Sequence, residues 1–194
     1  GSGEQWRESA GFVYQWGRKD PFHDAIEEQS GTAFFITESI LYPNMISASY
    51  DWVYDDDPVD RKLLWTSKTK TIYDPCPVGY RVPPKDTWTS FTTTGENVQK
   101  KIQVNMSGTW DKGYNFKYDG TNTAWYPSTM YAYWTPYWQD NIGGLWSGDA
   151  YGNGENACYF DYYYNSDMEL HVSPSTENTN SIRYGGAVRC VIDA

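Results

Sequence analysis

The sequence predicts a single α+β domain built of short antiparallel strands, one or two helices and long irregular loops. Its 194 residues suit one domain and are enough to bury a substantial core. Short strand candidates recur between turn residues, and residues 157–164 are one of them. A helix is predicted where Pro83 and Pro84 precede Trp88 and Phe91, which lie three residues apart.

The stretch 70–84 carries the strongest local constraints on the backbone. Pro75 and Pro77 fix φ on both sides of Cys76 and remove two backbone hydrogen-bond donors. We therefore expect a rigid bend at this cysteine in place of a regular strand. Residues 78–82 are predicted to form a short strand after the bend.

The N-terminal part of the chain has little periodicity and is predicted to be irregular. A strand is expected around Tyr14 and Trp16, because the two aromatic residues alternate as on one face of a strand. A second strand is expected at 32–36 and one helical turn at 39–41. Residues 1–3 are typical of a cloning remnant.

Strand and turn patterns continue through the second half of the chain. Short strands or loops are predicted at 99–106 and 110–118, with a turn at Asp119 and Gly120. The last strands are expected at 170–172 and 186–192. The segment between them, 174–181, is predicted to be an exposed loop.

Charge and hydropathy exclude several classes of partner. A formal net charge of -10 disfavours binding to nucleic acid or to anionic lipid, both of which need a basic surface. No apolar run approaches the roughly 18 residues that a membrane-spanning helix needs. We therefore expect neither a nucleic-acid partner nor direct membrane insertion of this domain.

Aromatic residues make up 18 % of the chain, including 18 Tyr and 10 Trp. Between residues 125 and 165 they are interspersed with Gly, Asn, Ser and Asp, a vocabulary similar to that of antibody paratopes. Packing within a β-sheet is the alternative, and both uses are expected in different segments. We expect ligand contacts from Tyr131, Tyr133, Tyr137, Trp138, Asp149, Tyr151, Asn153, Asn156, Tyr159 and Tyr163.

Within 157–164, alternation separates two faces of the predicted strand. One face carries Cys158, Phe160, Tyr162 and Tyr164, and the other carries Tyr159, Asp161 and Tyr163. We expect one face to pack inward and the other to meet solvent.

Three stretches of this chain resemble a known family. They are Tyr-Asp-Pro-Cys-Pro-Val-Gly-Tyr-Arg-Val-Pro at 73–83 with Trp88 beyond it, Arg-Tyr-Gly-Gly-Ala-Val-Arg-Cys-Val at 183–191, and Gly-Phe-Val-Tyr-Gln-Trp-Gly-Arg-Lys-Asp-Pro-Phe at 11–22. The stretches 73–83 and 183–191 resemble the motifs of the Fibrobacter succinogenes major paralogous domain, and 11–22 is similar to a segment found upstream in gut bacterial members.

That family is a branch of the C-type-lectin-like fold, which also holds formylglycine-generating enzymes and the variable proteins of diversity-generating retroelements. The resemblance implies a C-type-lectin-like fold, with residues 4–69 as an N-terminal elaboration and 70–192 as the family core. It also implies that Trp134 and Trp146 belong to the core, because the family motif places a Trp in the strand that resembles 145–148.

Three cysteines are present, which suggests one disulfide and one free thiol in an exported protein. Because Cys76 and Cys190 lie in the two family motifs, the resemblance implies that they form the pair. Cys158 is then expected to be a buried free thiol. A zinc site is not expected, since no two cysteines are close in sequence and the histidines, His23 and His171, are isolated.

A cluster of aspartates at positions 51, 55, 56, 57 and 60 offers the oxygen ligands that calcium prefers. The spacing lacks the central Gly and distal Glu of a calcium loop, so a solvated acidic loop is the favoured interpretation. The Glu-Pro-Asn, Gln-Pro-Asp and Trp-Asn-Asp triplets of calcium-dependent lectins do not occur in this sequence. We therefore expect no metal and no cofactor.

These observations together predict a non-enzymatic ligand-binding module of a bacterial surface or secreted protein that recognises a protein or a glycan. Its Tyr- and Asn-rich segment is similar in composition to segments diversified by retroelements. The alternatives are a structural adhesin or fimbrial display domain, and an oxidase like the formylglycine-generating enzymes that would use Cys158 and Cys190. An extracellular or cell-surface location is expected.

Overall fold

The computed structural model describes residues 9–22, 33–40, 42–46, 51–132, 136–138, 140–164, 170–174 and 176–193, with the backbone alone for 130–132 and 136–138. These residues form mostly small β-sheets with few helical segments, in agreement with the predicted α+β class. Within these ranges there is no helix of the length and apolar character that a bilayer crossing requires.

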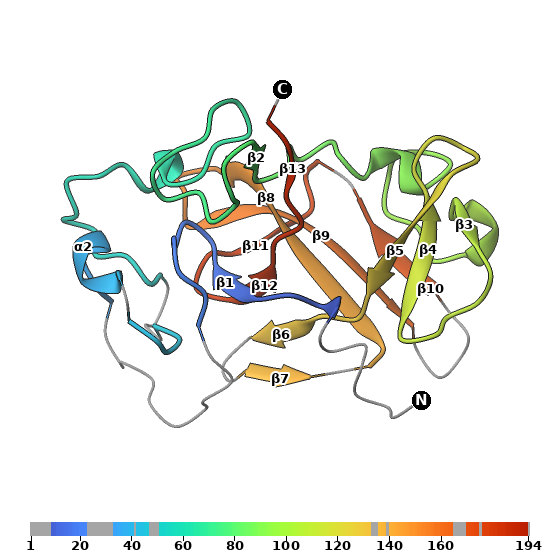
Figure 1. Ribbon diagram of the computed structural model, residues 1–194, viewed down its shortest axis with the longest axis horizontal. Coiled ribbons are helices and arrows are strands. Elements are labelled where there is room, and N and C mark those ends of the chain that lie inside the picture. Colours follow the sequence, from blue (N-terminus) through green and yellow to red (C-terminus); the bar gives the residue numbers. More distant parts are fainter. Residues whose placement is uncertain are drawn as a thin grey trace.

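Eight of the described strands form one central sheet (Figure 1). Along its main path the strands are, in spatial order, β10 (Leu170–Ser173), β9 (Asn156–Tyr164), β8 (Ile142–Tyr151), β12 (Gly185–Ala187), β6 (Met130–Ala132) and β7 (Pro136–Trp138). Two further strands lie off this path: β1 (Val13–Gln15) pairs with β12, and β11 (Thr179–Ser181) pairs with β9.

The long hairpin of β8 and β9 is the centre of this sheet. Its strands pair antiparallel from Ile142 opposite Tyr163 to Tyr151 opposite Asn156, with a shift of register between Trp146 and Ala150. The last core strand, β12, runs parallel to β8 and antiparallel to β1 and β6. The N-terminal and C-terminal segments therefore meet in the middle of the sheet.

Two small sheets accompany the central one. β13 (Val191–Ile192) pairs with β2 (Tyr80–Arg81), and β3 (Met106–Ser107), β4 (Gly113–Lys117) and β5 (Thr123–Pro127) form an antiparallel sheet. The strands predicted at 78–82 and 110–118 correspond to β2 and β4. Gly79, with φ of +81°, occupies the left-handed region that favours glycine just before β2.

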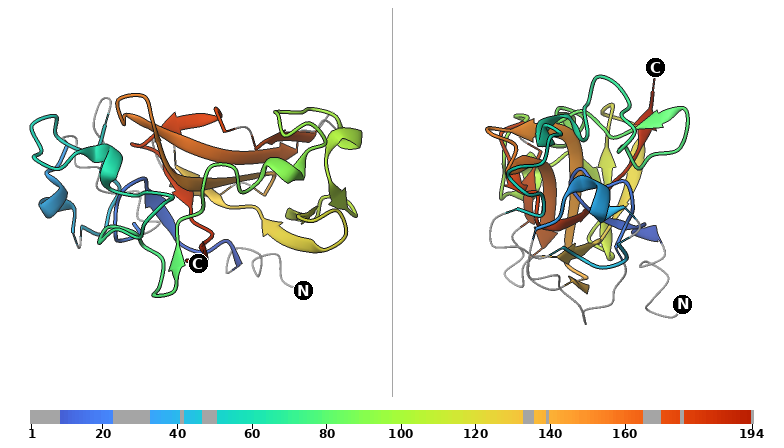
Figure 2. Two further views of the ribbon diagram at one scale, coloured as in Figure 1. Left: turned by 90° about the horizontal axis from the view of Figure 1, so that it is seen from above. Right: turned by 90° about the vertical axis from the view of Figure 1, so that its left-hand side faces the viewer.

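The β8–β9 hairpin is covered by packed side chains on both faces. Phe160 and Tyr162 pack into one cluster with residues of β4 and β5, whereas Tyr159 packs into a different cluster with the N-terminal segments. The predicted alternation along 157–164 is confirmed, but Tyr159 is only 4 % exposed and does not meet solvent. Figures 1 and 2 show the helix α2 (Ile36–Ser39) toward one end of the molecule and β3–β5 toward the other.

Four tryptophans form the centre of the N-terminal cluster, and each has a hydrogen bond for its indole N–H. The bonds run from Trp16 to the Ser147 carbonyl, from Trp52 to the Trp16 carbonyl, from Trp65 to the Tyr73 carbonyl and from Trp146 to the Tyr14 carbonyl, at 2.8 to 3.0 Å. Satisfying the indole donor removes the main cost of burying a Trp. Trp146 is a core residue, as expected, and Trp134 lies outside the described residues.

The helix predicted after Pro84 is shorter than expected. Residues 85–88 form turns, and a 3-10 helix covers only Thr89–Phe91. The hydroxyls of Thr87 and Thr89 donate to the carbonyls of Pro84 and Asp86, which competes with regular helical bonding. Trp88 and Phe91 are nevertheless both buried, at 2 % and 1 % exposure.

Two further expectations on secondary structure were wrong. In the N-terminal part, Phe34 makes one isolated bridge to Val53, and the helix α2 (Ile36–Ser39) begins where the strand 32–36 was expected to end. The segment 174–181 is not simply an exposed loop, because its last residues form β11 against β9. The pairing of β11 with β9 joins segments that are distant in sequence, so the local sequence pattern did not predict it.

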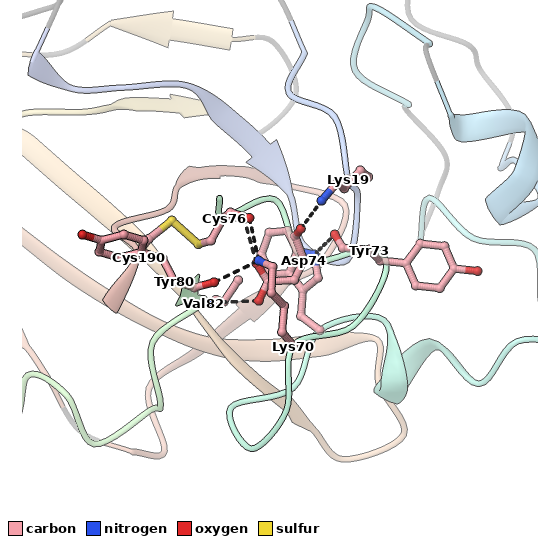
Figure 3. Close-up of a disulfide and its surroundings, with 9 residues drawn as sticks. Lys19, Lys70, Tyr73, Asp74, Cys76, Tyr80, Val82 and Cys190 are labelled. Atoms are coloured by element: carbon pink, nitrogen blue, oxygen red, sulfur yellow. Dashed lines mark hydrogen bonds and ion pairs between the residues drawn. A yellow bond between two sulfur atoms is a disulfide. The ribbon is translucent and has the colours of Figure 1, made fainter. Parts of the chain in front are cut away.

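The bend at 74–82 is held by one buried carboxylate (Figure 3). Asp74 is fully buried and accepts hydrogen bonds from the backbone N–H groups of Cys76 and Val82, at 2.8 and 3.0 Å. Lys70 donates to the same carboxylate at 2.9 Å and also to the carbonyls of Cys76 and Tyr80. The group thus ties together the start and the end of the bend.

A disulfide fastens this bend to the last strand. Cys76 is bonded to Cys190, as the family resemblance implied, and the bond spans 114 residues of chain. It lies beside the pairing of β2 with β13, so covalent and hydrogen bonds close the same junction.

We expect Asp74→Asn to lower the free energy of unfolding by about 3 kcal/mol, because the amide NH₂ would face donors that now bind a carboxylate. Chemical denaturation of both proteins measures the difference. Asp56→Asn is the matched control, because Asp56 is exposed and its side chain makes no hydrogen bond to a described residue. A loss equal to that of the control would contradict the role given to Asp74.

Candidate functional site

The residues predicted to contact a ligand do not form one site. Asp149, Tyr151, Asn153 and Asn156 lie at the turn of the β8–β9 hairpin, while Tyr163 pairs with Ile142 at its opposite end. Nine residue steps along β8 correspond to roughly 30 Å. A single small ligand cannot contact both ends.

At the turn of the hairpin, polar side chains serve the fold. Asp149 accepts hydrogen bonds from the Ser67 hydroxyl at 2.7 Å and from the Lys85 backbone N–H at 2.8 Å. Asn153 accepts from the N–H of Glu155 within the turn. Of the predicted residues here, Tyr151 presents a large surface, with 47 % of its area exposed.

Tyr159 and Tyr163 both contact protein rings. Tyr159 packs edge-on against Trp146 with ring centroids 4.7 Å apart, and its burial makes it part of the core. Tyr163 stacks on His171 with centroids 4.5 Å apart. Tyr159 is therefore not available to a ligand at the surface.

Three of the remaining predicted residues lie in β6 and β7. Tyr131 pairs directly with Tyr137, and Trp138 pairs with Met130, in a short antiparallel ladder. Tyr133 lies outside the described residues. The backbone places Tyr131 and Tyr137 as a cross-strand pair on one face of this ladder.

A pocket lined by aromatic rings lies where the β3–β5 sheet meets the end of the β9–β10 pair. Its volume is about 350 Å³, within the range of small-molecule sites. It is lined by Trp110, Tyr114 and Tyr164, by the apolar Met106 and Leu170, and by the exposed Lys101 and Thr109. None of these residues was among those predicted to contact a ligand.

The rings in this aromatic pocket have a defined geometry. Trp110 and Tyr164 lie nearly parallel, with an angle of 11° between their planes and centroids 6.3 Å apart. Tyr114 meets Trp110 edge-on at 4.7 Å. Both Trp110 and Tyr164 are half-buried, so each keeps part of its surface exposed where it lines the pocket.

Sequence reasoning assigned Trp110 and Tyr164 to separate strands or loops. They meet because β4 packs against the end of β9, where Tyr114 and Tyr162 enter one cluster. The available sequence cue was a Trp before a Gly-containing turn. This cue did not reveal that Tyr164 is the ring beside Trp110.

A smaller hollow of about 250 Å³ lies beside Arg189. The guanidinium stacks over the Tyr126 ring at 4.1 Å and donates to the Trp125 carbonyl at 2.5 Å. These contacts attach the C-terminal motif to β5. The hollow has no facing pair of half-buried rings like that of the aromatic pocket.

The cysteines do not form a pair for redox chemistry in the C-terminal core. Cys190 is bonded to Cys76, and Cys158 is a buried free thiol that donates to the Thr176 carbonyl at 3.3 Å. Burial raises the pKa of Cys158 to about 11, so the thiol is protonated at neutral pH.

The acidic segment 51–60 is largely engaged in structure. Arg61 pairs with Asp51 and Asp55, Asp57 accepts from the backbone N–H of Ile36 at 2.7 Å, and Asp60 caps the 3-10 helix that follows. Across the described ranges, no three His, Cys, Asp or Glu side chains are close enough to hold a metal ion.

A polar cluster lies between β9, β10 and β11. Asp161 pairs in register with Ser173, whose hydroxyl is 2.5 Å from His171 Nε2, and Asn178 donates to Asp161 at 3.4 Å. Burial raises the pKa of Asp161, although hydrogen bonds from Ser173 and Asn178 and the nearby His171 oppose the shift.

Comparisons with protein-family models, with curated protein sequences and with solved structures found no significant match. Function is therefore inferred from the geometry of the sites.

We expect Asp161→Asn to change how stability depends on pH. A carboxyl whose pKa is raised by folding contributes stability below its unfolded pKa of about 3.9 and loses it as pH rises through the folded value. Asn stays neutral, so the difference in unfolding free energy between Asp161→Asn and the wild type should grow in favour of the variant from pH 4 to pH 7.

Urea denaturation across this pH range measures the effect. Asp111→Asn is the control, because Asp111 is exposed and its side chain has no hydrogen bond to a described residue. Parallel pH profiles for Asp161→Asn and the wild type would show that the Asp161 carboxyl is not strained by burial.

Proposed function

We propose that this protein is a non-enzymatic ligand-binding module with a C-type-lectin-like fold, and that its ligand enters the aromatic pocket. The observation that carries the proposal is the set of half-buried rings around a space of about 350 Å³. An aromatic surface that is only half covered by protein retains apolar area for a partner.

The proposed fold draws support from how the resembling stretches are arranged. The stretch 73–83 contains β2, which pairs with β13 at the end of the stretch 183–191. The disulfide joins the same two stretches. The remaining stretch, 11–22, contains β1, which pairs with β12. Three segments far apart in sequence thus form one connected unit.

A location on the bacterial surface or outside the cell is part of this proposal. The disulfide between Cys76 and Cys190 favours an oxidising environment. A formal net charge of -10 suits an exposed protein that does not bind nucleic acid.

A structural adhesin or fimbrial display domain is the other candidate. It is favoured by the complete burial of several aromatic side chains in the segment 125–165, including Trp146, Phe160 and Tyr162. These rings stabilise the fold and are not available for recognition. The open aromatic pocket is the feature that a display domain does not need.

Diversification by a retroelement is retained as a hypothesis for the exposed residues of the segment 131–165. In its described part, Tyr151 and Asn153 are exposed and can vary at little cost, whereas Tyr162 is fully buried. Sequencing the locus across a population of cells would test it, and a lack of excess substitution at exposed positions would remove it.

The decisive experiment screens the purified protein against glycans and against host and bacterial surface proteins, with and without a metal chelator. We expect chelator-insensitive binding that weakens about tenfold or more in Trp110→Ala, because the largest ring of the pocket is lost. Trp110→Phe, which keeps an aromatic face, should retain part of the affinity.

Tyr118→Ala is the matched control, since Tyr118 is exposed at the end of β4 and does not line the pocket. Binding that is equally strong in Trp110→Ala would place the ligand elsewhere. No binding across the panel would favour the display domain.

A further inference from the structure

The aromatic pocket contains polar groups that the protein leaves for a ligand. Tyr114, Tyr164, Thr109 and Lys101 line it, and the side-chain polar group of none of them makes a hydrogen bond to a described residue. Burial raises the pKa of Tyr114 well above its usual range, and the neighbouring Tyr164 phenol adds to the shift. The two phenol groups are therefore close enough to interact, and that of Tyr114 carries an O–H at neutral pH.

The apolar wall of the pocket is held in place by contacts outside it. The indole N–H of Trp110 donates to the Asp140 carbonyl at 3.1 Å, and Lys112 forms an ion pair with the Asp140 carboxylate. The edge of Tyr114 supports the Trp110 ring. A ring fixed before binding loses little entropy when a ligand stacks on it.

We infer that the aromatic pocket binds a neutral pyranose ring, whose C–H face stacks on Trp110 and whose hydroxyls bond to the phenols of Tyr114 and Tyr164. This inference rests on the proposed function, because it names the class of ligand for the same pocket. Thr109 and Lys101 at the rim provide further donors for the outer hydroxyls.

The polar groups disfavour an apolar protein side chain as the occupant of the pocket. Such a side chain would cover the two phenol hydroxyls without replacing their water, and each unpaired group costs about 1–3 kcal/mol. A sugar has an apolar face and hydroxyls on its edge, so it can satisfy both parts of the pocket. The formal net charge of -10 disfavours an acidic sugar.

Saturation-transfer NMR on the intact protein tests this inference. The probes are the methyl glycosides of glucose, galactose, mannose and N-acetylglucosamine, with toluene as an apolar ring of similar size. We expect at least one glycoside to receive saturation at its ring C–H protons. Its affinity should fall about tenfold in Trp110→Ala and roughly two- to tenfold in Tyr164→Phe, which keeps the ring and removes one hydroxyl.

Tyr118→Ala should bind the same glycoside as the wild type, and thermal unfolding of each variant checks that it is folded. If Trp110→Ala does not fold, the loss in Tyr164→Phe alone decides. The inference is overturned if no glycoside is saturated, if toluene binds and the glycosides do not, or if Tyr164→Phe binds as the wild type does.

The two proposals fail in different ways. If a surface protein from the screen binds and is lost in Trp110→Ala while no glycoside binds, the pocket is a recognition site but its occupant is not a sugar. If neither a glycan nor a protein depends on Trp110, both proposals are wrong.

Discussion

The buried carboxylate of Asp74 is the constraint on which the rest of the structure depends. It has no contact with solvent and is neutralised by Lys70, while two backbone N–H groups complete its hydrogen bonds. A buried charge is tolerated only with partners of this kind. The bend that this carboxylate holds positions Cys76 for its bond to Cys190. The disulfide in turn holds the last strand beside the bend.

The central β8–β9 hairpin is covered by side chains on both faces. This double burial explains the high aromatic content of the chain. A strand pair buried on two sides needs large side chains at successive positions, as Leu145 and Trp146 on β8 and Tyr159 and Phe160 on β9 show. Among the aromatic side chains that the structure describes in the segment 125–165, five are buried and therefore structural: Tyr126, Trp146, Tyr159, Phe160 and Tyr162. The half-buried Trp110 and Tyr164 lie at the margin of this packing, where the β3–β5 sheet meets the end of β9.

The aromatic pocket owes its chemistry to this position at the margin. Neighbouring rings orient Trp110 and Tyr164, and the Asp140 carbonyl also orients Trp110, yet each residue keeps part of its surface exposed. The turn of the hairpin, about 30 Å away, is polar but uses Asp149 to hold Ser67 and Lys85. The proposed recognition site and the structural hydrogen bonds of Asp149 thus lie at opposite ends of the β8–β9 hairpin.

The sequence by itself determined the bend at Cys76, the disulfide through its family motifs, the buried free thiol and the alternation along 157–164. Proline chemistry and a period of two act over a few residues, so local sequence carries them. Only the tertiary structure decided that Tyr159 is a core residue, that Asp149 holds Ser67 and Lys85 by hydrogen bonds, and that Trp110 and Tyr164 line the same pocket. Those outcomes depend on which segments cover each face of β8 and β9. The spacing of residues in the sequence does not predict long-range packing of that kind.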